Sequence, residues 1–178
     1  MGREDRVKGH GSLQALEGLS LPGQDASRSR ALSRGQESHN KNAVCPYIDV
    51  SVRVRYADTD RMGIVYYGNY PQYFEIGRSE YMRERGFPYR ELEEMGYNLV
   101  VVGLEAKYHN SAVYDDLLIV KTAISNLMSR GLTFHYEIYK DETMIVDGMT
   151  KHICQNPDKK PVLLPPNLLE VLKDVKSR

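Results

Sequence analysis

The sequence contains no tryptophan and only two cysteines, and it has no excess of either charge. Two cysteines, Cys45 and Cys154, are too few for a disulfide framework and suit a reducing compartment, so we expect a cytoplasmic protein. The 24 basic and 24 acidic residues give a net charge of zero, which argues against a nucleic-acid partner. No run approaches the roughly 18 apolar residues of a membrane-spanning helix, so we expect no transmembrane segment.

Aromatic residues are absent from the first 46 positions, although 13 tyrosines follow. This first segment has six glycines, six serines and no periodic apolar pattern. Such a segment cannot bury enough surface to offset the entropy lost on ordering. Its acidic residues and its lack of an apolar run argue against a targeting signal. We therefore predict that residues 1–46 are a disordered extension and that residues 47–178 form one folded domain.

The spacing of apolar residues predicts one strand and then one long helix at the start of this domain. Positions 48–56 alternate between apolar and polar side chains, which is typical of a half-buried strand. Asn69 is expected to cap the helix with its side-chain oxygen, Pro71 falls in the first turn, and Gly86 ends it. The predicted helix buries one face, made of Tyr70, Tyr73, Phe74, Gly77 and Tyr81.

The rest of the domain is rich in strands. We expect a short helix at 88–95, strands at 97–109, 117–126, 132–140 and 143–155, and a helix at 168–175. The first of these strands contains L-V-V-V at 99–102, a pattern typical of a fully buried strand. Four strands joined by short turns are mostly antiparallel. The sequence therefore predicts an α+β fold, in which an antiparallel sheet of about five strands wraps around one long helix and two copies cover each other's exposed sheet edges.

Candidate catalytic groups are densest between positions 56 and 70, in Y-A-D-T-D-R-M-G-I-V-Y-Y-G-N-Y. Two carboxylates, Asp58 and Asp60, follow the first strand. Gly63 and Gly68 allow tight turns and the close approach of a ligand. The helix then begins with unpaired N–H groups and a positive dipole. A carboxylate beside such N–H groups suits acyl transfer, because the N–H groups stabilise an oxyanion while the carboxylate activates water or attacks directly.

These residues carry a resemblance to a known family. The pattern V-x-V-x-Y-x-D-T-D-x-x-G-x-V-Y-x-x-N-Y covers 52–70, and F-E-x-x-R-x-E-x-x-R covers 74–83. A third stretch, A-x-Y-H-N-S-A, begins at Ala106. The sequence thus resembles the 4-hydroxybenzoyl-CoA thioesterase family, in particular its bacterial branch of short acyl-CoA thioesterases associated with the Tol-Pal system. The resemblance implies the hotdog fold, homodimers often paired into homotetramers, and no metal or bound cofactor.

The resemblance also implies roles for individual residues. It makes Asp60 the catalytic carboxylate, as nucleophile or as general base, and makes the main-chain N–H of Tyr67 the oxyanion donor. Several members of the branch have histidine or another larger residue where Gly68 stands, so substrate preference is open here. Residues expected to bind substrate are Gly63, Val65, Tyr66, Gly68, Asn69, Glu75 and, for the phosphates of coenzyme A, Arg130.

Simpler structural roles compete for some of these residues. Asp58 is expected to cap a turn, Glu75 has an alternative role as partner of Arg78 or Ser79, and the histidines are expected to be structural. An EF-hand-like calcium site in D-T-D-R-M-G lacks its ligands at Met62 and at Asn69.

The predicted function is hydrolysis of an acyl-CoA thioester. The alternatives are an acyl-carrier-protein thioesterase, a non-catalytic hotdog ligand-binding protein, and a hotdog dehydratase, which needs a histidine that the D-T-D loop does not supply.

Overall fold

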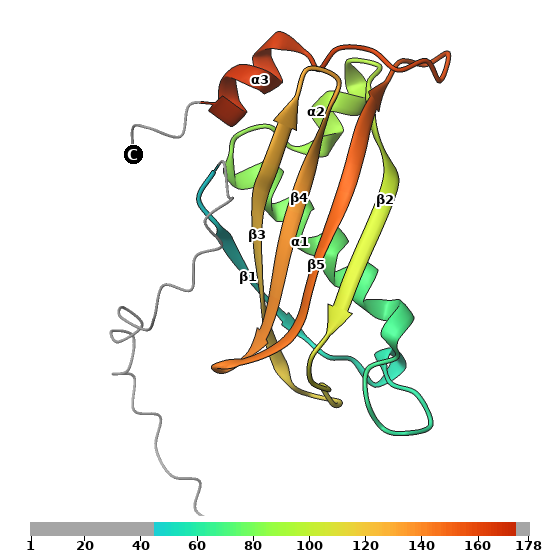
Figure 1. Ribbon diagram of the computed structural model, residues 1–178, viewed down its shortest axis with the longest axis vertical. Coiled ribbons are helices and arrows are strands. Elements are labelled where there is room, and N and C mark those ends of the chain that lie inside the picture. The colour runs from blue at the N-terminus through green and yellow to red at the C-terminus, as the bar shows by residue number, and fades with distance from the viewer. Residues whose placement is uncertain (1–44, 174–178) are drawn as a thin grey trace, which may run out of the picture. The chain divides into compact units, whose positions relative to one another are not determined.

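A five-stranded antiparallel sheet curves around helix α1 in the computed structural model, which describes residues 45–173 (Figure 1). The strand order is β1-β3-β4-β5-β2, so β1 and β2 form the two edges. This confirms the α+β arrangement predicted from the order of the elements. The strands are β1 (Ile48–Arg53), β2 (Asn98–Tyr108), β3 (Leu117–Met128), β4 (Gly131–Lys140) and β5 (Thr143–Gln155). The α-helices are α1 (Tyr70–Glu84), α2 (Tyr89–Glu94) and α3 (Pro166–Lys173).

Helix α1 packs on the concave face of the sheet with the side chains that its spacing predicted. All five predicted residues are buried, together with Met82. The Phe74 ring stacks on Tyr136 of β4, with 4.4 Å between ring centroids and 13° between planes. Gly77 lies against β3, because a Cβ at this position would come within 2.8 Å of Val120 Cγ1. Because α1 packs this closely on β3 and β4, the N-terminus of the helix is fixed relative to the sheet.

The predicted burial of L-V-V-V is wrong. Val100, Val101 and Val102 lie on edge strand β2, and 36%, 42% and 50% of their surfaces are exposed. The composition is that of a buried strand, but within one chain only β5 pairs with β2. A run of apolar residues therefore marks a strand that lacks one neighbour in this chain.

The packed structure begins earlier than expected. Cys45 is buried, and its thiol donates a hydrogen bond to the carbonyl oxygen of Leu172 at 3.2 Å. It lies two residues before the predicted domain start at Tyr47. Residues 1–44 and 174–178 lie outside the described residues, so disorder of the extension stays a prediction there. Within 45–173, no helix is long and apolar enough to cross a membrane.

Candidate active site

The predicted catalytic loop is a tight hairpin between β1 and α1. Thr59 and Val65 form an antiparallel bridge, and the N–H of Asp60 donates to the carbonyl oxygen of Ile64 at 2.9 Å. Gly63 closes the turn with φ +76°, a left-handed conformation that costs glycine little. The hairpin therefore holds Asp60 at its tip.

Asp58 ties this hairpin to the strand before it and the helix after it. It is 2% exposed, and its carboxylate accepts hydrogen bonds from the Arg55 N–H (2.9 Å), the Arg55 guanidinium (2.7 Å) and the Tyr73 hydroxyl (3.0 Å). Its carbonyl oxygen accepts from the Tyr66 N–H and from the Asn69 amide, both at 2.9 Å. The bonds from Arg55 hold the pKa of Asp58 below its usual range although burial opposes them. The predicted turn-capping role of Asp58 is confirmed.

The predicted cap by Asn69 is wrong. Its side chain makes no capping bond to the helix, because the amide nitrogen donates across to the carbonyl oxygen of Asp58. The backbone of Asn69 is already helical, at φ −90° and ψ −17°, whereas a side-chain cap needs an extended residue. Asn69 instead joins the D-T-D hairpin to the helix.

The Asp60 carboxylate is partly exposed and lightly bound. Its Oδ1 accepts the N–H of Met62 at 2.8 Å. The neighbouring Tyr66 has a raised pKa, first because its hydroxyl hydrogen-bonds that of Tyr67 and, less strongly, because the Asp60 carboxylate is close. The Asp60 carboxylate therefore lies close to Tyr66, which leads into the helix, and Met62 is its one hydrogen-bond donor among residues 45–173.

A short 3-10 turn, η2 (Tyr67–Asn69), leads directly into α1. Within the described part of the chain, the main-chain N–H groups of Tyr67 and Gly68 have no hydrogen-bond acceptor. Gly68 leaves no room for a larger residue without rearrangement, because a Cβ would lie 2.7 Å from Cε1 of Tyr66. Two adjacent N–H groups are thus open to an incoming oxygen atom.

Tyrosine rings surround this opening. Tyr66 and Tyr67 lie 4.5 Å apart between ring centroids, and the ring of Tyr108 on β2 lies 6.4 Å from Tyr67 and 5.6 Å from Tyr70. The Tyr108 hydroxyl donates to the carbonyl oxygen of Tyr67 at 3.2 Å. The sequence-based reasoning gave Tyr108 no role. Its position in A-x-Y-H-N-S-A was the signal that could have identified it.

Two predicted binding residues, Glu75 and Arg130, lie outside this cluster of tyrosines. Glu75 pairs with Arg78, its alternative partner, and lines a hollow of about 580 Å³ beside β1 that Arg53 and Tyr73 also line. Arg130 lies in the turn between β3 and β4. The Asp60 hairpin instead contacts the segment just before β3, where Ile64 pairs with Val113 and the Val65 N–H donates to Ala112 O, so Arg130 and Asp60 lie at opposite ends within one chain.

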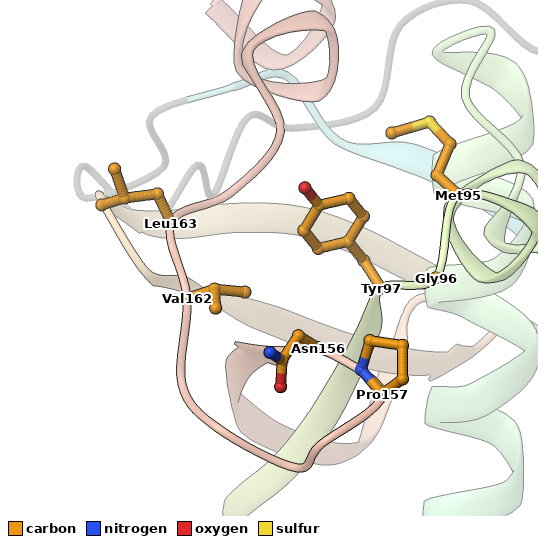
Figure 2. A pocket seen from close by; sticks show the side chains of 7 residues that line it. All are labelled: Met95, Gly96, Tyr97, Asn156, Pro157, Val162 and Leu163. Carbon is orange, nitrogen blue, oxygen red and sulfur yellow. The ribbon is translucent and has the colours of Figure 1, made fainter.

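A second hollow, of about 460 Å³, lies where β2 begins. The Tyr97 ring projects into it, and the remaining lining comes from Met95, Gly96, Asn156, Pro157, Val162 and Leu163 (Figure 2). None of these side chains is a carboxylic acid, histidine or cysteine. The hollow therefore offers contact surface but no group for hydrolysis.

Comparisons with known proteins agree with this fold and identify the family. Residues 54–172 match the family model described as the thioesterase-like superfamily. The chain is 36% identical to acyl-CoA thioesterase YbgC of Haemophilus influenzae over 116 residues, 64% of this chain and 85% of the relative. The DHNA-CoA thioesterase of Staphylococcus aureus superposes with TM-score 0.70 at 32% identity, over 73% of this chain and 91% of that one. The 4-hydroxybenzoyl-CoA thioesterase of Pseudomonas, 20% identical with TM-score 0.65 over 71% of this chain and 99% of that one, shares the fold.

Proposed function

The chain belongs to the thioesterase-like superfamily, and from that membership we propose that it is an enzyme that hydrolyses an acyl-CoA thioester to a free acid and coenzyme A. One observation carries the proposal. The Thr59–Val65 hairpin carries a lightly bound carboxylate, Asp60, and the open N–H groups of Tyr67 and Gly68 follow that hairpin in the chain, at the start of the helix. The names of the relatives in Haemophilus influenzae and Staphylococcus aureus support acyl-CoA as the substrate class.

In the proposed reaction, the thioester carbonyl oxygen accepts a hydrogen bond from the helix-start N–H of Tyr67. This bond strengthens as negative charge develops on that oxygen. Asp60 either takes a proton from water, which then adds to the carbonyl carbon, or adds to it directly and forms an anhydride that water cleaves. In both routes the carbon–sulfur bond breaks, the coenzyme A thiolate leaves and takes up a proton, and the acid is released.

The proposed substrate contacts follow from the same loop. Gly63, Val65, Tyr66, Gly68 and Asn69 lie within ten residues of Asp60, on the hairpin or at the helix start. The half-exposed Tyr66 ring, which lies against Gly68, and the exposed main chain of Gly68 suit a flat contact with the acyl or pantetheine chain. Glu75 lines the neighbouring hollow, and its side chain is 56% exposed beside Arg78, so a substrate in that hollow would reach it.

We further propose that two copies pair through β2, as the exposed valines of that edge favour. Antiparallel pairing would bring the beginning of β2 in one subunit beside the end of β2 in the other. Arg130 and the hollow around Tyr97 lie at the beginning of β2, and Asp60 lies at its end. Arg130 would then serve the coenzyme A phosphates of the partner subunit's site rather than of its own.

The test of the proposed function is Asp60→Asn, assayed with a panel of acyl-CoA and acyl-carrier-protein thioesters and a thiol-reactive chromophore. Asparagine keeps the shape of aspartate but cannot act as base or nucleophile. We expect kcat to fall by at least roughly 100-fold, equivalent to about 3 kcal/mol of barrier, with a much smaller change in KM. The ratio of kcat/KM for the acyl-CoA and acyl-carrier-protein thioesters shows which of the two is the substrate class.

Asp58→Asn is the matched comparison, because it makes the same chemical change two residues away. It weakens the bonds to Arg55 and Tyr73, so we expect a loss of stability of roughly 1–3 kcal/mol and a smaller kinetic effect than at Asp60. Retention of wild-type kcat by Asp60→Asn, with loss by Asp58→Asn, would reverse the assignment. Wild-type kcat in both variants would exclude a carboxylate mechanism.

A further inference from the structure

Tyr108 connects the edge of the sheet to the start of helix α1. It is the last residue of β2, opposite Val146 in the register with β5, and the chain stays tied to β5 through the bond from the His109 N–H to Ile145 O at 2.9 Å. Figure 1 shows β2 ending at the same end of the sheet as the loop that leads into α1. From this anchored position the Tyr108 hydroxyl donates to the carbonyl oxygen of Tyr67 at 3.2 Å.

The carbonyl oxygen of Tyr67 belongs to the same peptide unit as the N–H of Gly68. A hydrogen bond to that oxygen fixes the plane of the peptide and polarises its N–H group. The contact therefore aims the Gly68 N–H and steadies the adjoining N–H of Tyr67. We propose that Tyr108 is a positioning residue for the oxyanion donors at the helix start, acting through the Tyr67 carbonyl; this rests on the proposed thioester hydrolysis at that site.

Packing alone does not account for the Tyr108 hydroxyl. The residue is 47% exposed, so a hydroxyl directed elsewhere would be satisfied by water. Its ring meets Tyr67 edge-on, at 82° between planes, and meets Tyr70 at 61°. Phenylalanine would keep both ring contacts. What only tyrosine adds is the hydrogen bond to the helix-start peptide.

The first measurement is the kinetics of Tyr108→Phe in the full-length protein. A neutral hydrogen bond contributes roughly 0.5–1.5 kcal/mol, so we expect kcat to fall by roughly 3- to 10-fold, with KM within about twofold of the wild type. The melting temperature should fall by no more than a few degrees, and the sedimentation coefficient should not change. Tyr114→Phe is the matched control, because Tyr114 is 57% exposed and packs edge-on against Tyr56, and its hydroxyl has no hydrogen-bond partner among residues 45–173. Its kcat should equal that of the wild type.

The second measurement uses two stable analogues of the acyl-CoA that is hydrolysed fastest. One is a difluoroketone, in which CF2 replaces the thioester sulfur, so that its activated carbonyl adds water or the carboxylate and resembles the tetrahedral intermediate. The other is a thioether, in which CH2 replaces the carbonyl. Donors that act on the carbonyl oxygen affect only the ketone. We expect Tyr108→Phe to weaken ketone binding by roughly the factor seen in kcat and to leave thioether binding unchanged.

The outcomes separate this inference from the proposed function. Wild-type kcat and wild-type ketone affinity in Tyr108→Phe, with hydrolysis still dependent on Asp60, would overturn the positioning role alone. Equal weakening of both analogues would show a general packing role and would also overturn it. A wild-type protein that hydrolyses none of the thioesters would overturn both.

Discussion

At the scale of single residues, Asp58 and Asp60 have the same side chain but accept very different numbers of hydrogen bonds. Asp58 is buried and accepts four hydrogen bonds from Arg55 and one from Tyr73. Asp60 is partly exposed, and its carboxylate accepts one, from Met62. A carboxylate whose lone pairs are occupied by an arginine and a phenol is a poor base or nucleophile. The free carboxylate is the one that the family resemblance also makes catalytic.

His152 is the residue whose titration should control stability in mild acid. It is fully buried, and its pKa is lowered to about 4, first by burial and then by the charge of Arg78. Its Nε2 lies 2.8 Å from the Thr150 hydroxyl, which in turn lies 2.6 Å from the Tyr136 hydroxyl. When Nδ1–H faces the carbonyl oxygen of Leu99 at 3.4 Å, Nε2 of the neutral ring accepts from Thr150. Protonation of Nε2 removes that acceptor and obliges the Thr150 hydroxyl to donate to Tyr136 instead.

Because this pKa is below the ordinary value, the unfolded chain binds more protons than the folded one between about pH 6.5 and pH 4. Stability should therefore fall as pH falls through that window. We expect a loss of roughly 2 kcal/mol between pH 7 and pH 5, measured by denaturant unfolding. This part of the loss should be absent in His152→Gln and present in the exposed-residue control His109→Gln. Parallel curves for wild type and His152→Gln would exclude the explanation.

At the scale of elements, periodicity predicted which segments are helices and strands and which face of α1 is buried. It did so because helix and strand repeats differ and the core selects one face. It could not distinguish a doubly buried strand from an edge strand, since L-V-V-V fits either. Nor could it direct the Asn69 side chain to Asp58, because capping is decided by backbone angles that the local sequence does not determine.

Gly77 tests the close packing of α1 on β3. An alanine Cβ would lie 2.4 Å from Thr122 Oγ1 and 2.8 Å from Val120 Cγ1, and both residues are fully buried. Although alanine favours the helix, overpacking should dominate and cost roughly 1–3 kcal/mol. Glu84→Ala is the control, since it places alanine on the exposed face of the same helix. Thermal unfolding of both variants measures the difference. Equal melting temperatures would show that α1 can move away from the sheet without cost.

At the scale of the whole molecule, the two ends of the sheet differ. The Asp60 hairpin, the helix start and Tyr108 gather at one end, whereas Arg130 and the hollow around Tyr97 lie at the other. The sequence could relate the hairpin to the helix start, because these are nearly continuous from 58 to 70, but it gave Tyr108, 41 residues after Tyr67, no role. The second could not be related to it from one chain's sequence, because only assembly would bring the two ends together.

Assembly through β2 is tested by placing a charge on the exposed edge. Val102 lies near the middle of β2 and is 50% exposed, so Val102→Lys should change the stability of one chain by less than about 0.5 kcal/mol. In antiparallel pairs the two lysines would face each other near the twofold axis, where like charges oppose association. We expect the wild type to sediment as a dimer or tetramer at micromolar concentration and Val102→Lys to shift towards monomer. Activity should fall in parallel if Arg130 acts on the partner subunit's site.

Ser51→Lys places the same charge on the other edge strand, β1, and should leave the assembly intact. Dissociation by Ser51→Lys alone would move the interface to β1, and a fully active wild-type monomer would exclude a shared site.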